Sequence, residues 1–235
     1  MNLDARDGGL VFFPKRRIVW GKIGKAAGTS LLQVFESHWG EAVHAKNDWM
    51  RYRRHDMQFN PRAWFRVVFV RNPFARFASL YRYWLKVGLA PAGETFGEFV
   101  DRFYDRYNLA DQVFRLHAMP AENYLFPWST AIGFVGQVER IDRDVGRLFT
   151  ALGDEAPAAV PKLNASTAAS DWRTLYDDCP EAVHFVLEFY GGDFGDDPST
   201  LPDRVCGYSY LKDYRSRYEA GQAVTFEVEA QKGQF

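Results

Sequence analysis

The chain has 235 residues, of which 47% are hydrophobic and 17% aromatic, and a chain of that length buries roughly 70–75% of its unfolded surface in a core. Its 29 Lys and Arg residues nearly balance its 30 Asp and Glu residues, which gives a formal net charge of −1. This balance excludes a non-specific nucleic-acid binder, which would be basic, and makes any affinity for anions a local property. We expect a single domain over residues 1–235.

The beginning of the chain, Met1 to Asp7, has neither the basic region nor the apolar region of a signal peptide. No apolar run approaches the roughly 18 residues of a membrane-spanning helix. The sequence therefore predicts a cytoplasmic protein without a membrane-spanning segment. Cys179 and Cys206 form no CxxC pair and no cluster with histidine at zinc-ligand spacing, so we expect two ordinary thiols and no metal.

Four short apolar runs rich in β-branched residues predict strands at 17–21, 42–45, 65–70 and 132–138. Segments with helical periodicity separate them, which is the pattern of an α/β fold with a parallel sheet and crossover helices. The first of these helices should end at Gly40.

Further helical patterns follow Pro73 and continue through about 94–118, 139–152 and 180–190. The small residues and prolines between Gly153 and Pro161 indicate a connection that could act as a lid. Residues 191–235 read as an irregular extension, with one alternating run at 224–229 that could form an edge strand.

The loop after the first predicted strand reads Ile23-Gly24-Lys25-Ala26-Ala27-Gly28-Thr29-Ser30. Glycines permit a tight turn, the new helix offers its unpaired amides, and Lys25 adds a positive charge, so this loop can cradle a phosphate or sulfate. An alternative is a simple turn in which Lys25 is solvated and Thr29 or Ser30 caps the helix. The order of residues differs from the GxxxxGK[ST] loop of nucleoside triphosphatases, because Lys25 precedes the last glycine.

A second junction of strand and helix reads Phe69-Val70-Arg71-Asn72-Pro73, with Ser79 about two turns into the helix. Asn72 suits the N-cap and Pro73 the first helical position. Arg71 then lies at the carboxyl edge of the sheet, where α/β proteins bind ligands. Its planar fork and the Ser79 hydroxyl could close on one phosphate.

The helix after Pro73 has two faces that differ in composition. An apolar stripe predicts the packed face, and three residues with polar groups fall on a different face that we expect to be free for function. The stripe comprises Phe74, Phe77, Tyr81 and Trp84, and the other face carries Arg76, Ser79 and Tyr83.

The two loops, at 23–30 and 69–81, together resemble the cofactor loops of sulfotransferases that use 3′-phosphoadenosine 5′-phosphosulfate (PAPS). They are most similar to the bacterial branch related to carbohydrate sulfotransferases such as heparan sulfate 2-O-sulfotransferase. The segments 134–140 and 161–166 are similar to later parts of that family, and the likeness covers about 17–190. It implies a three-layer α/β/α fold around a central sheet, the P-loop-like sulfotransferase fold.

The resemblance also implies roles for individual residues. The 5′-phosphosulfate of PAPS would be held by the first loop, the 3′-phosphate by the second, and the cofactor would be covered by the segment with Ser166. The residues concerned are Lys25, Ala26, Ala27, Gly28, Thr29 and Ser30, then Arg71 and Ser79. Two departures are visible, since Gly24 replaces the usual proline and Asn72 the usual acid.

Sulfuryl transfer to a hydroxyl needs a general base, and five histidines are candidates: His38, His44, His55, His117 and His184. The resemblance favours His44, which lies at the end of a strand candidate between the two loops. His55 is the alternative because Arg51, Arg53 and Arg54 precede it, and His38 reads as a core residue.

The segment 46–66 holds six basic residues, two acidic residues and four aromatic residues (Trp49, Tyr52, Phe59 and Trp64), which suits an anionic sugar or an ordinary solvated flank. The acceptor therefore stays open, with a saccharide or small metabolite expected. Two alternatives to a sulfotransferase are a magnesium-dependent, P-loop-like kinase and a module that binds a nucleotide or an anionic glycan without turnover.

Overall fold

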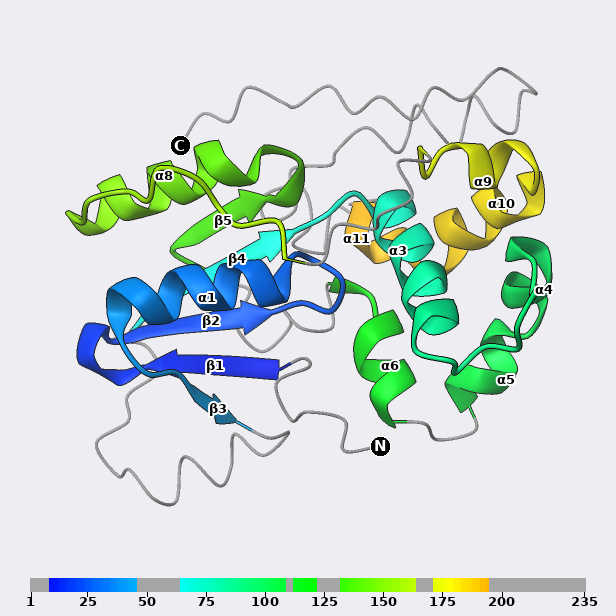
Figure 1. The fold of residues 1–235 in the computed structure, drawn as a ribbon, viewed down its shortest axis with the longest axis horizontal. Helices are drawn as coiled ribbons and strands as arrows, with labels where there is room; N and C mark the ends of the chain where they lie inside the picture. Colours follow the sequence, from blue (N-terminus) through cyan, green and yellow to red (C-terminus); the bar gives the residue numbers. More distant parts are fainter. Residues whose placement is uncertain (1–8, 46–63, 109–111, 122–131, 164–170, 195–235) are drawn as a thin grey trace. The chain divides into compact units, whose positions relative to one another are not determined.

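The computed structural model describes residues 9–45, 64–108, 112–121, 132–163 and 171–194 (Figure 1). They belong to two compact units, one formed by Met1–Arg71 with Tyr124–Ala165 and the other by Asn72–Asn123 with Ser166–Phe235. Each unit has its own buried core. The single domain expected from the sequence stays a prediction.

The first unit is built on a sheet whose described strands run in the order β3-β1-β2-β4-β5. Strands β2, β4 and β5 are parallel neighbours, whereas β1 is antiparallel to both β2 and β3. The strands are β1 (Gly9–Phe13), β2 (Ile18–Lys22), β3 (Val43–Ala45), β4 (Phe65–Val70) and β5 (Phe134–Gln137). The α/β class with a largely parallel sheet is therefore confirmed.

Strands β2 to β5 match the four apolar runs, but the sequence did not predict β1 or its antiparallel pairing. The short 3-10 helix η1 (Pro14–Arg16) joins β1 to β2, and Arg17 closes the turn at a left-handed φ of 53°. Hairpin turns are normally recognised by glycine or asparagine at such a position. Here an arginine takes it, so the usual hairpin signal is missing.

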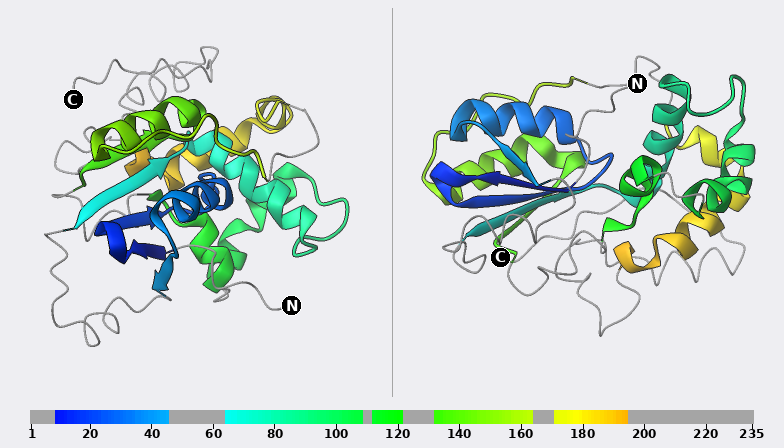
Figure 2. Two further views of the ribbon diagram at one scale, coloured as in Figure 1. Left: turned by 60° about the vertical axis from the view of Figure 1, so that its left-hand side comes forward. Right: turned by 90° about the horizontal axis from the view of Figure 1, so that it is seen from below.

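Two helices, α1 (Gly28–Trp39) and α8 (Ile141–Leu152), pack on one face of this sheet, as the right view of Figure 2 shows. Leu31 and Phe35 of α1 and Leu148 and Phe149 of α8 are buried against alternate strand residues such as Trp20. Gly40 ends α1 as expected, with a φ of 89° and its N–H bonded to the Glu36 carbonyl. Strand residues of the opposite face, among them Phe12, Val19 and Val68, are buried too, as a three-layer arrangement requires.

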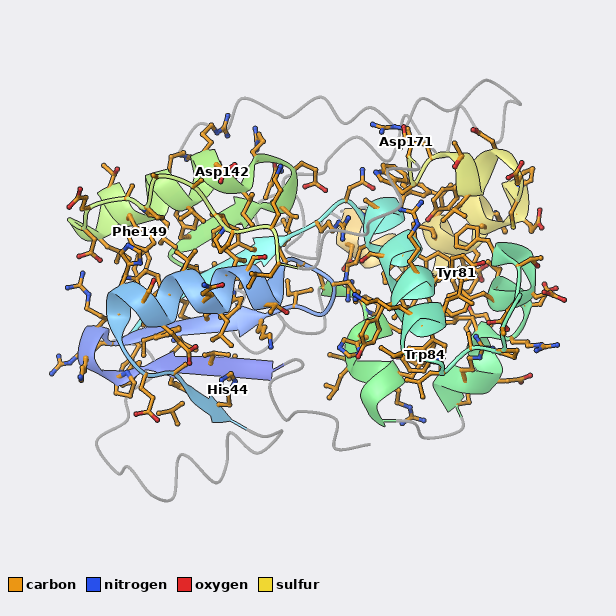
Figure 3. All side chains as sticks on the ribbon, in the orientation of Figure 1. His44, Tyr81, Trp84, Asp142, Phe149 and Asp171 are labelled. Atoms are coloured by element: carbon orange, nitrogen blue, oxygen red, sulfur yellow. The ribbon has the colours of Figure 1, made fainter. Side chains whose placement is uncertain are left out.

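The second unit is helical in its described residues. Helix α3 begins at the predicted Pro73, with the Asn72 side chain accepting from the amides of Phe74 and Ala75. Its predicted apolar stripe is confirmed, and Figure 3 labels Tyr81 and Trp84 of that stripe. The helices are α3 (Pro73–Lys86), α4 (Phe96–Asp101), α5 (Phe103–Asn108), α6 (Gln112–Ala118), α9 (Thr174–Asp177), α10 (Pro180–Phe189) and α11 (Gly191–Phe194).

Among the described residues, no helix combines the length and the apolar character needed to cross a membrane. The alternating run at 224–229 lies outside the described residues, as do most of residues 191–235.

Candidate anion-binding site at the sheet edge

The loop between β2 and α1 is a tight turn whose strained positions are not its glycines. The amide of Ala26 donates to the carbonyl of Ile23 at 3.3 Å, which closes a four-residue turn. Lys25, the third residue, has a φ of 63°, whereas Gly24 has no positive φ. This is the pattern of a type II turn, in which glycine is favoured third and proline second.

This geometry changes the role expected for Gly24. The sequence argument assigned conformational freedom to Gly24 and Gly28, but the left-handed residues are Lys25 and Ala27, at φ 63° and 58°. A left-handed residue with a side chain costs about 1–2 kcal/mol. Strain of that size at two positions of one short loop is typical of functional sites.

The N-terminus of α1 is left without a side-chain cap. Ala27 is the N-cap and supplies no side-chain acceptor, and the helix continues through Thr29 and Ser30. The alternative in which Thr29 or Ser30 caps the helix is therefore wrong. Because amides of a first helical turn lack partners within the helix, an uncapped N-terminus favours a bound anion.

Lys22, the last residue of β2, is a cation that sequence reasoning missed. It is only 6% exposed, and a Cβ added at Gly28 would lie 2.8 Å from its Cε. The Lys22 side chain thus packs closely against Gly28 at the start of α1, and a larger residue there would have to displace it. The only sequence signal was a lysine three residues before Lys25.

Arg71 lies against this loop. It follows β4, the parallel neighbour of β2, and its Nη1 donates to the carbonyl oxygen of Lys25 at 3.1 Å. The two predicted loops therefore meet at one edge of the sheet. They bring together a guanidinium, a left-handed lysine and an uncapped helix end.

The connection after α8 also reaches the loop. Asp154 accepts from Arg16 and from the indole of Trp39, and Val160 is buried with its amide bonded to Asp142. Further along, the amide of Leu163 lies 3.4 Å from the Ser30 hydroxyl, which accepts from it. The segment proposed as a lid is thus held at several points. Ser166 lies outside the described residues.

The segment 134–140, which the sequence likened to a later part of the sulfotransferase family, contains β5 and reaches the same edge of the sheet. Gln137, which pairs with Val70 in the sheet register, is 8% exposed and accepts a hydrogen bond from Arg140 Nη2. Its own amide donates to the buried carboxylate of Asp144 at 2.9 Å. These bonds fix the end of β5 beside the end of β4.

His44 lies on β3, at the edge of the sheet, and is labelled in Figure 3. It pairs with Val11 of β1, which in turn pairs with Trp20 of β2. Two strand spacings, roughly 10 Å, separate His44 from β2. His44 is half-buried, and through Val11 it lies in register with Trp20, two positions before Lys22.

The other histidines have different surroundings. His38 was expected in the core but is exposed on α1, with Nδ1 2.8 Å from the Val34 carbonyl and its ring edge-on to Phe149. His117 is buried in the second unit, and His184 is exposed near Glu188. His55 lies outside the described residues.

The basic segment at 46–66 is described only at its end. Trp64 packs edge-on against Phe12, with ring centroids 6.0 Å apart, and Arg66 is 7% exposed within β4. These two residues therefore belong to the packing of the sheet. Residues 46–63 lie outside the described residues.

Ser79 and Arg76 belong to the second unit, on α3. Ser79 is half-buried, about two turns from the start of the helix. Arg76 was expected on a free face, but it is 1% exposed and donates to Asp193 and to the backbone carbonyls of His117 and Met119. The expectation of a free face is therefore wrong at Arg76, because its guanidinium is buried among these partners.

Comparison with known proteins identifies the class of protein that carries this arrangement. Residues 9–195 match the family described as "Sulfotransferase family". The chain therefore belongs to the sulfotransferase family, and it is a transferase of that class.

Among solved structures, the chain is similar to a sulfotransferase from Alicyclobacillus acidocaldarius. The two share 13% sequence identity over 76% of this chain and 86% of the other, with a TM-score of 0.35. No curated protein sequence matches the chain.

Proposed function

We propose that this sulfotransferase moves a sulfuryl group from PAPS to a hydroxyl of a saccharide or small metabolite. The observation that carries the proposal is the contact between Arg71 and the Lys25 carbonyl at 3.1 Å, which joins the two loops at one edge of the sheet. A donor with phosphate at both its 3′ and 5′ positions needs two anion sites on one surface. The uncapped start of α1 and the strained loop fit one of its ends.

In this proposal, the loop from Lys25 to Ser30 holds the 5′-phosphosulfate, with Ala26, Ala27, Gly28 and Thr29 supplying backbone amides or a hydroxyl. Arg71 and Ser79 hold the 3′-phosphate, and Ser166 contributes to covering the nucleotide. PAPS supplies a sulfuryl group whose bond to the 5′-phosphate oxygen breaks as the acceptor oxygen bonds to sulfur. The Lys25 ammonium stabilises the negative charge that grows on the departing phosphate.

His44 is the proposed general base, which takes the proton of the acceptor hydroxyl. It lies on the edge strand, roughly two strand spacings from β2. The proposal therefore requires the attacking hydroxyl to be within hydrogen-bond reach of His44 while it faces the sulfur. His55 remains the alternative base. The cytoplasmic location and the heparan-like branch stay predictions from the sequence.

The proposal is tested by thermal melting of the protein alone, with 3′-phosphoadenosine 5′-phosphate (PAP), and with ATP and Mg²⁺. A ligand at 100 times its dissociation constant adds about 2.7 kcal/mol to the free energy of unfolding. We expect PAP to raise the melting temperature. Stabilisation by ATP with Mg²⁺ and not by PAP would favour the kinase alternative and overturn the proposal.

A second experiment separates an enzyme from a binding module. His44→Ala should abolish sulfuryl transfer and leave PAP affinity unchanged, because the base acts on the acceptor and not on the donor. A variant that keeps full transfer activity would exclude His44 as the base and direct the same test to His55.

A further inference from the structure

Arg71 contacts the backbone of the first loop, not only the space where a ligand would bind. Its Nη1 donates to the carbonyl oxygen of Lys25 at 3.1 Å. The register pairs Gly21 of β2 with Val68 of β4, so Arg71 leaves β4 where the loop leaves β2. Arg71 is half-buried and directly follows β4, so its side chain reaches the turn that follows the neighbouring strand β2.

The carbonyl that Arg71 contacts belongs to the left-handed residue of the turn. Lys25 has a left-handed φ of 63°, and the following amide, of Ala26, closes the turn on the Ile23 carbonyl at 3.3 Å. Side-chain sterics disfavour this conformation, so it persists only where its surroundings hold it. A hydrogen bond from a charged donor is stronger than one from a neutral donor and fixes the orientation of the peptide it contacts.

We propose that Arg71 is a positioning residue for the Lys25 turn, in addition to its proposed contact with the 3′-phosphate. The inference rests on the proposed function and deepens it. One side chain then links both ends of the donor site, so that loss of Arg71 disturbs the 5′ end even for a ligand that has no 3′-phosphate.

The ligand experiment compares PAP with adenosine 5′-monophosphate (AMP), which lacks the 3′-phosphate, by titration calorimetry. We expect Arg71→Ala to weaken binding of both, AMP by about tenfold. The matched control is Ser79→Ala, since Ser79 has a proposed role only at the 3′-phosphate. This control should weaken PAP and leave AMP unchanged. AMP affinity within twofold of wild type in Arg71→Ala would overturn the inference.

The second experiment needs no ligand and measures hydrogen exchange at the Ala26 amide. Arg71→Ala should speed this exchange about tenfold, whereas the Gly40 amide, bonded to Glu36 at the other end of α1, should be unchanged. An unchanged Ala26 rate would overturn the inference. Arg71→Met, which has a long side chain without a donor, should give the same acceleration and is used if Arg71→Ala does not fold.

The two experiments also separate the inference from the function on which it rests. If the wild-type protein binds neither PAP nor AMP, the proposed function fails. The exchange rate at Ala26 still reports whether Arg71 holds the turn.

Discussion

Lys25 occupies the one position of its turn where backbone sterics favour glycine. A residue retained there against its conformational preference is expected to be needed for its side chain. We predict that Lys25→Ala lowers the rate of sulfuryl transfer by at least about 100-fold, the loss typical of removing one electrostatic donor. Steady-state kinetics check this, and an alanine variant with more than a tenth of the wild-type rate would remove Lys25 from the mechanism.

Two substitutions of Lys25 separate its contribution to activity from its effect on stability. Lys25→Gly removes both the ammonium and the left-handed strain, so it should be as inactive as Lys25→Ala but more stable than it by about 1 kcal/mol. Urea denaturation of the two variants measures the difference. Equal stabilities would mean that the turn relaxes to another conformation once the lysine is lost.

Cys179 illustrates a residue whose chemistry is suppressed by its surroundings. Burial, followed by a hydrogen bond to Glu181, raises the pKa of its thiol from 9.0 to about 12. The stabilising contribution of the protonated thiol is therefore complete below pH 9 and is lost as the pH rises toward 12. We predict that iodoacetamide at pH 8 leaves Cys179 unmodified in the folded protein and alkylates it in urea, as peptide mass spectrometry would show. Rapid alkylation of the folded protein would contradict this.

At the scale of the element, helix α3 depends on its cap. Asn72 is 2% exposed, and its side-chain oxygen accepts from Phe74 at 2.9 Å and Ala75 at 3.3 Å. Asn72→Ala should lower the free energy of unfolding by about 1–2 kcal/mol, because the two buried amides lose their acceptor. Asn72→Asp keeps the acceptor and should retain most of the stability in urea denaturation. An equally large loss in Asn72→Asp would show that the packing of the asparagine side chain, and not its capping hydrogen bonds, stabilises the helix.

Elements of this kind could be predicted because their signals are local. Asn72 with Pro73, the glycine stop at Gly40 and the four apolar runs each lie within a few residues of the structure they specify. The contacts of the candidate site could not be read in this way. Arg71 reaches Lys25 across 46 residues of sequence, and Leu163 reaches Ser30 across 133. Such contacts follow from strand order, which periodicity does not encode.

The buried Lys22 escaped detection for the same reason. A lysine at a strand end is normally solvated, but Lys22 is buried and its side chain lies close to Gly28 at the start of α1. The strain at Lys25 and Ala27 was also hidden, because glycines nearby suggested an unstrained turn. Residue types indicated an anion site, but backbone angles were needed to describe how it is built.

At the scale of the whole molecule, positive and negative residues are nearly equal in number, but the cations are not spread evenly over the structure. The net charge is −1, yet Lys22, Lys25 and Arg71 gather at the sheet edge of the first unit. Charge is also paired internally, as between Arg16 and Asp154 in the first unit at 2.5 Å and between Glu94 and Arg106 in the second unit at 2.5 Å. Both units therefore pair part of their charge internally, and the cations at the sheet edge of the first unit are the ones for which we propose a ligand.

Arg76 is the clearest case of this internal use, and it ties three helices of the second unit together. It extends from α3 to Asp193 of α11 at 3.4 Å and to carbonyls at the end of α6. Its guanidinium also lies 5.4 Å from the centre of the Tyr190 ring. Arg76→Ala should lower the free energy of unfolding by about 3–5 kcal/mol, because it leaves the Asp193 charge buried without this partner. Urea denaturation measures the loss, with Lys86→Ala at the exposed end of α3 as a control expected within about 0.5 kcal/mol of wild type.

A double variant distinguishes the charge from the packing. If the uncompensated carboxylate causes most of the loss, adding Asp193→Asn to Arg76→Ala removes that charge and should restore part of the stability. The two substitutions would then be strongly non-additive, since each alone leaves one buried charge behind. Additive losses would mean that Arg76 stabilises the second unit through its contacts with the α6 carbonyls and the Tyr190 ring, with little dependence on Asp193.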